Sequence, residues 1–406
     1  MKRKLSKHVH GSGTIYDTFV SIMTSVRNKY KIIGYGEYGC VVYPPINTNL
    51  IETYQEYENK HKKDVGKLFK ISYNSQKDFM EEIHNLELTN LFDPNGIFTI
   101  RMKGANTINS ENVEDHVRQC LGVSYRHEYI YQIILENGGE SLDKIRPRSI
   151  SFAKYVKLVK QFIQGISQMQ SFGLCHRDIK PDNVLISENK INLIDFGVSE
   201  ELENIFTPKN KHVLEHRSAI YPPEFFMSSL LLDFKSNKKG FLEELANIIP
   251  EMEYQGYFEL LFNENSIEMV KEELEEFISS IKKNRLGYKD VFNAEMAKKC
   301  DIYSLFTIFE ELSDKVIITN EIQQRQIKTL IMKCKTINPY ERATINDISD
   351  ILNDMQESYD SSTKGGGDNV KFRRYLKIPK YHKSTLNNSS LPDCKSNSLN
   401  IIRKRK

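Results

Sequence analysis

The sequence predicts an α+β fold, in which a β-rich first part is followed by a mostly helical second part. Two runs typical of strands flank a glycine-rich stretch at 34–39, and a third strand-type run covers 129–135. Apolar residues recur at helical spacing over 75–92, 151–172 and 267–281. Strands are therefore expected in the first third of the chain, with one main helix among them, and helices dominate the rest.

The composition is that of a large soluble protein. Of the 406 residues, 39% are hydrophobic and 27% are charged, and the net charge of +3 gives no reason to expect specific nucleic-acid binding. No run of eighteen apolar residues predicts a transmembrane segment, and the first residues lack the apolar stretch of a secretory signal. The six cysteines form no C-x-x-C pair, which favours a reducing, intracellular and most simply cytoplasmic location.

One short segment carries most of the chemical information. Residues 176–185 read H-R-D-I-K-P-D-N-V-L, and Asp195 opens a D-F-G triplet seventeen residues after Asp178. This spacing places an acidic base, a cation and two oxygen ligands for a metal in one region. Phosphoryl transfer from Mg-ATP requires such a set, because its catalysis is mainly positioning and neutralisation of charge.

These motifs resemble those of the eukaryotic-type serine/threonine protein kinases, over roughly residues 28–357. The resemblance implies a bilobal kinase fold with ATP between the lobes, the N-lobe spanning about 28–137 and the C-lobe about 138–357. The composition is also similar to that of kinases from nucleocytoplasmic large DNA viruses, which would place the protein in a virion or viral factory. That second likeness concerns origin alone.

The resemblance gives each residue of the segment a role. Asp178 is the expected base for the acceptor hydroxyl, and Lys180 is expected to stabilise the transferring γ-phosphoryl group. Asn183 and Asp195 are the expected Mg²⁺ ligands, because oxygen ligands suit this hard cation. The D-x-K-P-x-N form implies Ser or Thr as the acceptor.

The glycine-rich loop is expected to cover the phosphates of ATP. Glycines allow backbone amides to approach phosphate oxygens closely, and the loop leads into a strand, which favours a kinase hairpin over a dinucleotide-binding turn. Leu185 would form the floor under the adenine ring, and Glu136 would begin the hinge that pairs with its edge. The loop glycines are Gly34, Gly36 and Gly39, and the apolar residues expected above the adenine are Ile33, Val41 and Val65.

The lysine that holds the α- and β-phosphates has two candidates. Alternation in a strand places residues i and i+2 on one face, so the residue two before the lysine should contact adenine. For Lys67 that residue is Val65, which fits, and for Lys70 it is the bulkier Leu68. Lys67 is therefore preferred and Lys70 is the fallback.

The glutamate that pairs with this lysine is expected on the helix over 75–92. Glu82 begins an E-I-x-x-L pattern, which matches the corresponding helix of the family, while Glu81 and Glu87 are its rivals. Farther along, two strands are expected over 97–135, with a polar loop at 106–118 between them.

Two distant residues are expected to form a structural ion pair. Glu224 ends a Y-P-P-E sequence that resembles the A-P-E end of the activation segment, and Arg342 ends an N-P-x-x-R sequence. Asp301 is expected to brace the backbone of the catalytic loop. In this family the arginine before the base, here Arg177, often pairs with a phosphate on the activation segment. Thr207 and Ser218 are candidate phosphosites, and both could equally be ordinary loop residues.

The chain departs from the family between Glu224 and Asp301, which are 77 residues apart. An insertion at about 228–297 is therefore expected, helical in part because Ile267, Val270, Leu274, Phe277 and Ile281 step by three or four. It could be a helical patch on the C-lobe or a docking surface for a substrate or partner.

Both ends of the chain are expected to lie outside the kinase domain. Residues 1–27 read as an N-terminal arm. Residues 358–406 read as a disordered tail, which holds twelve Lys or Arg against three Asp over 359–406, a net charge of about +9. This tail could be solubilising, could contact anionic surfaces or could be a nuclear signal.

The function predicted from the sequence is transfer of the ATP γ-phosphoryl group to Ser or Thr of protein substrates, with Mg²⁺. Two alternatives remain at this stage. One is a kinase-fold scaffold that binds ATP without turnover, and the other is a small-molecule phosphotransferase, which would usually lack the equivalents of Glu224 and Arg342.

Overall fold

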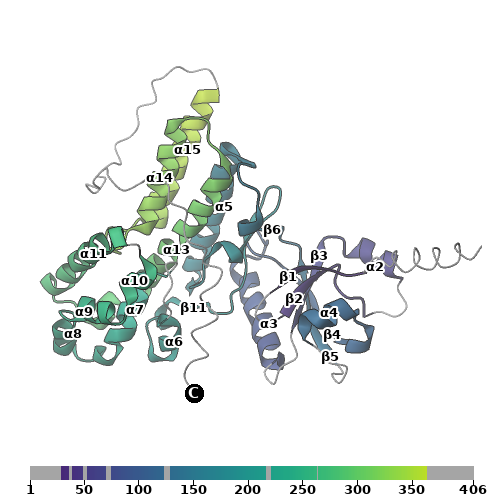
Figure 1. Cartoon of the computed structure of the whole chain (residues 1–406), viewed down its shortest axis with the longest axis horizontal. Coiled ribbons are helices and arrows are strands. Elements are labelled where there is room, and N and C mark those ends of the chain that lie inside the picture. Colours follow the sequence, from purple (N-terminus) through teal and green to yellow (C-terminus); the bar gives the residue numbers. More distant parts are fainter. Residues whose placement is uncertain are drawn as a thin grey trace, which may run out of the picture.

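The computed structural model has two lobes, which confirms the expected α+β bilobal fold (Figure 1). It describes residues 29–35, 39–48, 53–69, 75–122, 129–215, 221–262 and 264–363, so the N-terminal arm 1–27 and all of the tail after 363 lie outside the described residues. No helix among the described residues is long and apolar enough to cross a membrane.

The N-lobe is built on an antiparallel five-stranded sheet in the order β1-β2-β3-β5-β4. Side chains alternate between its faces, so Leu68 packs in a cluster with helix α4 on one face, whereas Val65 packs with helix α3 on the other. The strands and helices of this lobe are β1 (Lys31–Tyr35), β2 (Gly39–Tyr43), α2 (Tyr54–Lys60), β3 (Asp64–Phe69), α3 (Ser75–Phe92), β4 (Met102–Asn109), α4 (Asp115–Leu121) and β5 (Tyr129–Glu136).

Two short helices, α2 and α4, flank the sheet strands, and α4 begins inside a stretch expected to be a polar loop. The loop expected at 106–118 is wrong in part, because β4 continues to Asn109 and α4 begins at Asp115. Thr53 and Glu56 form a capping box at the start of α2, and Gly122 ends α4 in a left-handed conformation. These local capping signals were readable in the sequence, but each helix is only two turns long.

The C-lobe surrounds one large apolar core. Helix α5 (Phe152–Ser171) is its central element, with eleven buried residues, and α13 (Ala294–Lys315) lies beside it in the same core. Helices α14 (Glu321–Lys335) and α15 (Ile345–Thr363) complete the bundle (Figure 1). Helix α15 extends six residues past the boundary expected at 357. The lobe also contains short strands: β6 (Glu140–Ser141), β7 (Ile150–Ser151), β8 (Leu174–Cys175), β9 (Val184–Ile186), β10 (Ile191–Leu193), β11 (Glu200–Glu201) and β12 (Val316–Ile317).

The expected insertion is a set of helices packed into the C-lobe core. The boundaries expected at 228 and 297 fall inside α7 (Pro223–Leu231) and α13, so the added elements lie between these two helices. They gather at the end of the molecule away from the sheet (Figure 1). The elements are α8 (Lys238–Glu244), α9 (Ile248–Tyr254), α10 (Tyr257–Leu261), α11 (Glu264–Lys283) and α12 (Tyr288–Val291).

Helix α11 joins the insertion to the rest of the lobe. Its residues Leu274 and Phe277 are fully buried in the common core. The carboxylate of Glu273 accepts hydrogen bonds from the amides of Ile337, at 2.8 Å, and Asn338, at 3.3 Å. The helices of this stretch therefore share the apolar core of the C-lobe.

We expect Leu274→Ala to lower the free energy of unfolding by about 3 kcal/mol, because it leaves a cavity in this shared core. Urea unfolding should show one transition at lower denaturant. Met269→Ala, at a 39% exposed position of the same helix, is the matched control and should cost less than about 1 kcal/mol. An unchanged midpoint for Leu274→Ala would show that the insertion folds apart from the core.

Candidate active site

A buried carboxylate fixes the start of the catalytic loop. Asp301 of α13 accepts hydrogen bonds from the backbone amides of His176, at 2.8 Å, and Arg177, at 3.0 Å. Arg177 has a φ of +66°, a left-handed conformation that costs a non-glycine residue free energy. Burial raises the pKa of Asp301. The two hydrogen bonds from these amides to Asp301 therefore stabilise a turn that is unfavourable for the backbone by itself. Asp301 has the bracing position that the sequence predicted.

The side chain of His176 points into the core next to the D-F-G triplet. Its ring lies 4.8 Å from that of Phe196, and Nε2 is 3.1 Å from the carbonyl of Ile194. Burial lowers the pKa of His176, so the ring is neutral near pH 7. Phe196 also packs on Phe92 at the end of α3. These contacts join the catalytic loop, the D-F-G triplet and the main N-lobe helix.

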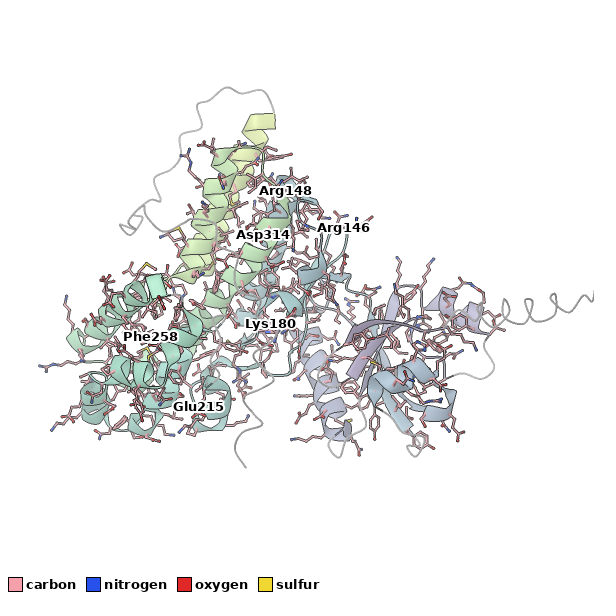
Figure 2. All side chains as sticks on the ribbon, in the orientation of Figure 1. Arg146, Arg148, Lys180, Glu215, Phe258 and Asp314 are labelled. Atoms are coloured by element: carbon pink, nitrogen blue, oxygen red, sulfur yellow. The ribbon has the colours of Figure 1, made fainter. Side chains whose placement is uncertain are left out.

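The carboxylate of Asp178 is bonded at both oxygens. Lys180 Nζ lies 2.7 Å and Asn183 Nδ2 lies 2.9 Å from Oδ2, and the hydroxyl of Tyr221 donates to Oδ1 at 2.8 Å. Burial acts to raise the pKa of Asp178, but the hydrogen bonds from Lys180 and Tyr221 outweigh it, and the pKa lies below its ordinary value. Asp178 is therefore ionised near neutral pH. Lys180 lies near the middle of the molecule in Figure 2.

The two predicted Mg²⁺ ligands, Asn183 and Asp195, lie on two chain segments that are hydrogen-bonded to each other. The amide of Ile194 donates to the carbonyl of Asn183 at 3.0 Å, which holds Asp195 beside the catalytic loop. Asn183 uses its side-chain nitrogen for Asp178, so its amide oxygen is turned away from that carboxylate. The Asp195 carboxylate is exposed. One amide and one carboxylate oxygen suit Mg²⁺, which keeps several positions for water and substrate phosphates.

Asn183 and Asp195 are the two protein ligands expected for the metal ion. Among the described residues, no group of three or more His, Cys, Asp or Glu could hold a metal by itself. The donor set fits an ion that is shared with a nucleotide.

The structure pairs Lys67 with Glu82. The distance from Nζ to Oε1 is 2.6 Å, and both side chains are mostly buried. Glu81 instead pairs with the exposed Lys77 at 3.6 Å, and Glu87 is exposed. Lys70 lies outside the described residues. Lys67 also shares its sheet face with Val65 and α3, so the geometry favours Glu82 over Glu81 and Glu87 as the partner of Lys67.

The residues expected around the adenine lie together. Val41 packs against a cluster that contains Val65 and Leu135. A Cβ added to Gly138 would lie 2.7 Å from Leu185, so the hinge runs directly over the expected floor residue. Ile33 is 39% exposed at the end of the sheet, next to Gly34 in β1, and Gly36 lies outside the described residues.

Gly39 has a packing reason to be glycine. A Cβ at this position would lie 1.7 Å from the carbonyl oxygen of Leu68 on the neighbouring strand. Gly34 has no such restriction, because a Cβ there would make only ordinary contacts with Val41. Of these two loop glycines, Gly34 is the one whose identity the protein interior does not explain.

The hinge backbone is tied to its surroundings. The amide of Glu136 donates to the carbonyl of Arg101 at 2.9 Å, and that of Asn137 donates to Lys63 at 2.8 Å. The carbonyl of Gly138 accepts from the buried Asn192 side chain at 2.9 Å. Asn192 was not singled out in the sequence, because a polar residue inside a short apolar strand carries no motif.

The predicted pair of Glu224 and Arg342 is completely buried. Arg342 Nη1 lies 2.8 Å from Glu224 Oε1, and neither side chain is exposed. The N–H groups of Arg342 are directed at the carbonyls of Lys299, Thr336 and Ile337. The attraction to Glu224 is therefore one of charge at short range, while the carbonyls fix the orientation of the guanidinium.

Comparison with known proteins finds a match to the protein kinase domain. The protein kinase domain matches residues 27–226 of this chain. This match, together with the relatives described below, supports assignment to the eukaryotic-type protein kinases. The match ends inside α7, so it covers the sheet, the catalytic loop and the D-F-G triplet but not the inserted helices.

Curated kinases are similar over parts of their length. A provisionally named serine/threonine-protein kinase of Acanthamoeba polyphaga mimivirus is 34% identical over 128 residues, which is 26% of this chain and 46% of that protein. The mitogen-activated protein kinase kinase 9 of Arabidopsis thaliana is 29% identical over 147 residues, 35% of this chain and 46% of that kinase. The chain thus spans less than half the length of these relatives.

We expect Asp301→Ala to release the loop that begins at His176. The amides of His176 and Arg177 lose a charged acceptor, and hydrogen exchange at both should accelerate about tenfold or more. Asp314→Ala removes an exposed carboxylate at the other end of the same helix and should change neither amide. Equal exchange rates in the Asp301 variant and the unaltered protein would contradict the bracing role.

Proposed function

We propose that this chain transfers the γ-phosphoryl group of ATP to serine or threonine hydroxyls of protein substrates. The observation that carries the proposal is the arrangement around Asp178. Its carboxylate is held by Lys180 and Asn183, while Lys67 and Glu82 form their pair in the N-lobe. Enzymes of this family need these groups in place together.

Each residue has one role in this proposal. Asp178, ionised and held by three donors, accepts the proton of the acceptor hydroxyl as its oxygen attacks the γ-phosphorus and the bond to the β,γ-bridging oxygen breaks. Lys180 neutralises charge on the transferring group, and Lys67, oriented by Glu82, binds the α- and β-phosphates. Asn183 and Asp195 would hold Mg²⁺, which supplies further charge neutralisation on the phosphates.

Serine or threonine is the favoured acceptor because Lys180 contacts the base directly. The D-x-K-P-x-N form that places this lysine resembles the serine/threonine branch of the family. The mimivirus relative is also named as a serine/threonine-protein kinase. A protein acceptor is favoured by the intact Glu224–Arg342 pair, which supports the segment after the activation loop.

Arg177 supports a role for phosphorylation in activation. Its Nη1 is buried and has no hydrogen-bond partner among the described residues, and burial lowers its pKa. A phosphate on the activation segment would supply the missing acceptor. Of the two candidate phosphosites, Thr207 donates its hydroxyl to the carbonyl of Asn204, and Ser218 lies outside the described residues.

The remaining proposals concern the ends of the chain and its location. We assign 28–357 to the kinase domain, with a short helical continuation, 1–27 to an arm and the residues after 363 to a basic tail. The tail would contact anionic surfaces or direct the protein to the nucleus, and otherwise the cytoplasm is the proposed location. Relation to a viral kinase is consistent with a viral factory.

We expect Asp195→Asn to abolish transfer from γ-labelled ATP to generic protein substrates and to the kinase itself, a loss of at least about 100-fold. Acid hydrolysis should find the label of the unaltered protein on phosphoserine and phosphothreonine. Asp233→Asn, an exposed aspartate of the same lobe, is the control and should keep full activity. Tight ATP binding without transfer would support a scaffold, and label only on small molecules would support a different phosphotransferase.

Removal of divalent cations should stop the reaction. With EDTA in excess, transfer should fall to background, since Asn183 and Asp195 would then leave the phosphate charges uncompensated. Added Mg²⁺ should restore it in the unaltered protein but not in Asp195→Asn. Full activity in EDTA would contradict the assignment of these two residues.

A further inference from the structure

Tyr221 is the one contact of the base that the kinase motifs did not predict. Its hydroxyl donates to Asp178 Oδ1 at 2.8 Å, across 43 residues of sequence. The side chain is half-buried, and burial together with the neighbouring Asp178 carboxylate raises the pKa of Tyr221. The phenol therefore stays protonated at neutral pH and acts as the donor.

The two oxygens of Asp178 are not equivalent. Oδ2 accepts from both Lys180 and Asn183, which fills the two lone-pair positions of a carboxylate oxygen. Among the described residues Oδ1 accepts from Tyr221 only, so one position is left. An acceptor hydroxyl that gives its proton to Asp178 would approach this remaining position on Oδ1.

The backbone that carries Tyr221 is anchored. Pro222 caps helix α7 with fixed dihedral angles, and Glu224, three residues after Tyr221, is locked to Arg342 in the buried ion pair. The Tyr221 ring also lies 6.2 Å from that of Phe225. A hydroxyl held in this way stands in place before a substrate arrives, which is the requirement for an orienting group.

We propose that Tyr221 is a positioning residue for phosphoryl transfer, whose hydroxyl holds Oδ1 of Asp178 in line with the incoming acceptor hydroxyl. This inference rests on the proposed kinase function. Through this hydrogen bond the end of the activation segment contacts the base directly. A change in the conformation of that segment would therefore change the orientation of the Asp178 carboxylate.

The test is Tyr221→Phe, which removes one oxygen and keeps the ring. We expect kcat for a protein acceptor to fall about tenfold, while KM for ATP stays within about twofold and the thermal unfolding midpoint is unchanged. Tyr254→Phe is the matched control, because Tyr254 is 87% exposed on α9, and it should behave as the unaltered protein.

The other outcomes separate this role from its alternatives. An unchanged kcat in Tyr221→Phe would overturn the positioning role. A higher kcat/KM with a lower KM for the acceptor would also overturn it, because the hydroxyl would then be competing with the substrate for Oδ1. If the unaltered protein transfers no phosphate to any protein under conditions where it binds ATP, the proposed function itself fails, and the role of Tyr221 fails with it.

Discussion

The active site depends on a carboxylate that does no chemistry. Asp301, a buried residue of helix α13, accepts hydrogen bonds from the amides of two successive residues of the catalytic loop. The turn at Arg177 has a left-handed conformation, and the next residue is the base. Without an acceptor on α13 this turn would relax, and Asp178 would lose its orientation. The orientation of the Asp178 side chain therefore depends on the hydrogen bonds between Asp301 and the two residues before Asp178.

A second constraint ties the N-lobe helix to the C-lobe. Asp93, directly after α3, accepts the backbone amides of Ile97, Phe98 and Thr99, and it is 1% exposed. Phe98 in turn packs so closely on Gly165 of α5 that a Cβ there would lie 2.2 Å from its ring. The end of α3 is thereby held against the C-lobe, and the Lys67–Glu82 pair joins this helix to the sheet.

The sequence predicts what short-range chemistry dictates. The helix expected over 75–92 is found as α3 with those bounds, Lys67 pairs with Glu82 as the resemblance implied, and Lys180 lies beside Asp178. The role of Tyr221 was not predictable, because its bond to Asp178 depends on where a distant loop returns. The same holds for Glu273, since its partners are backbone amides that follow α14 in the chain. Such contacts leave no periodic or motif signal.

The inserted helices support the Glu224–Arg342 ion pair, and Glu224 is three residues after Tyr221. A buried ion pair such as Glu224–Arg342 is expensive to desolvate and is useful only if its geometry is held. Arg342 is oriented by the carbonyls of the 336–337 turn, and α11 fixes that turn through Glu273, while Phe277 packs 5.1 Å from Tyr340. The insertion thus supports Arg342, Arg342 supports Glu224, and Glu224 fixes the backbone from which Tyr221 reaches the base.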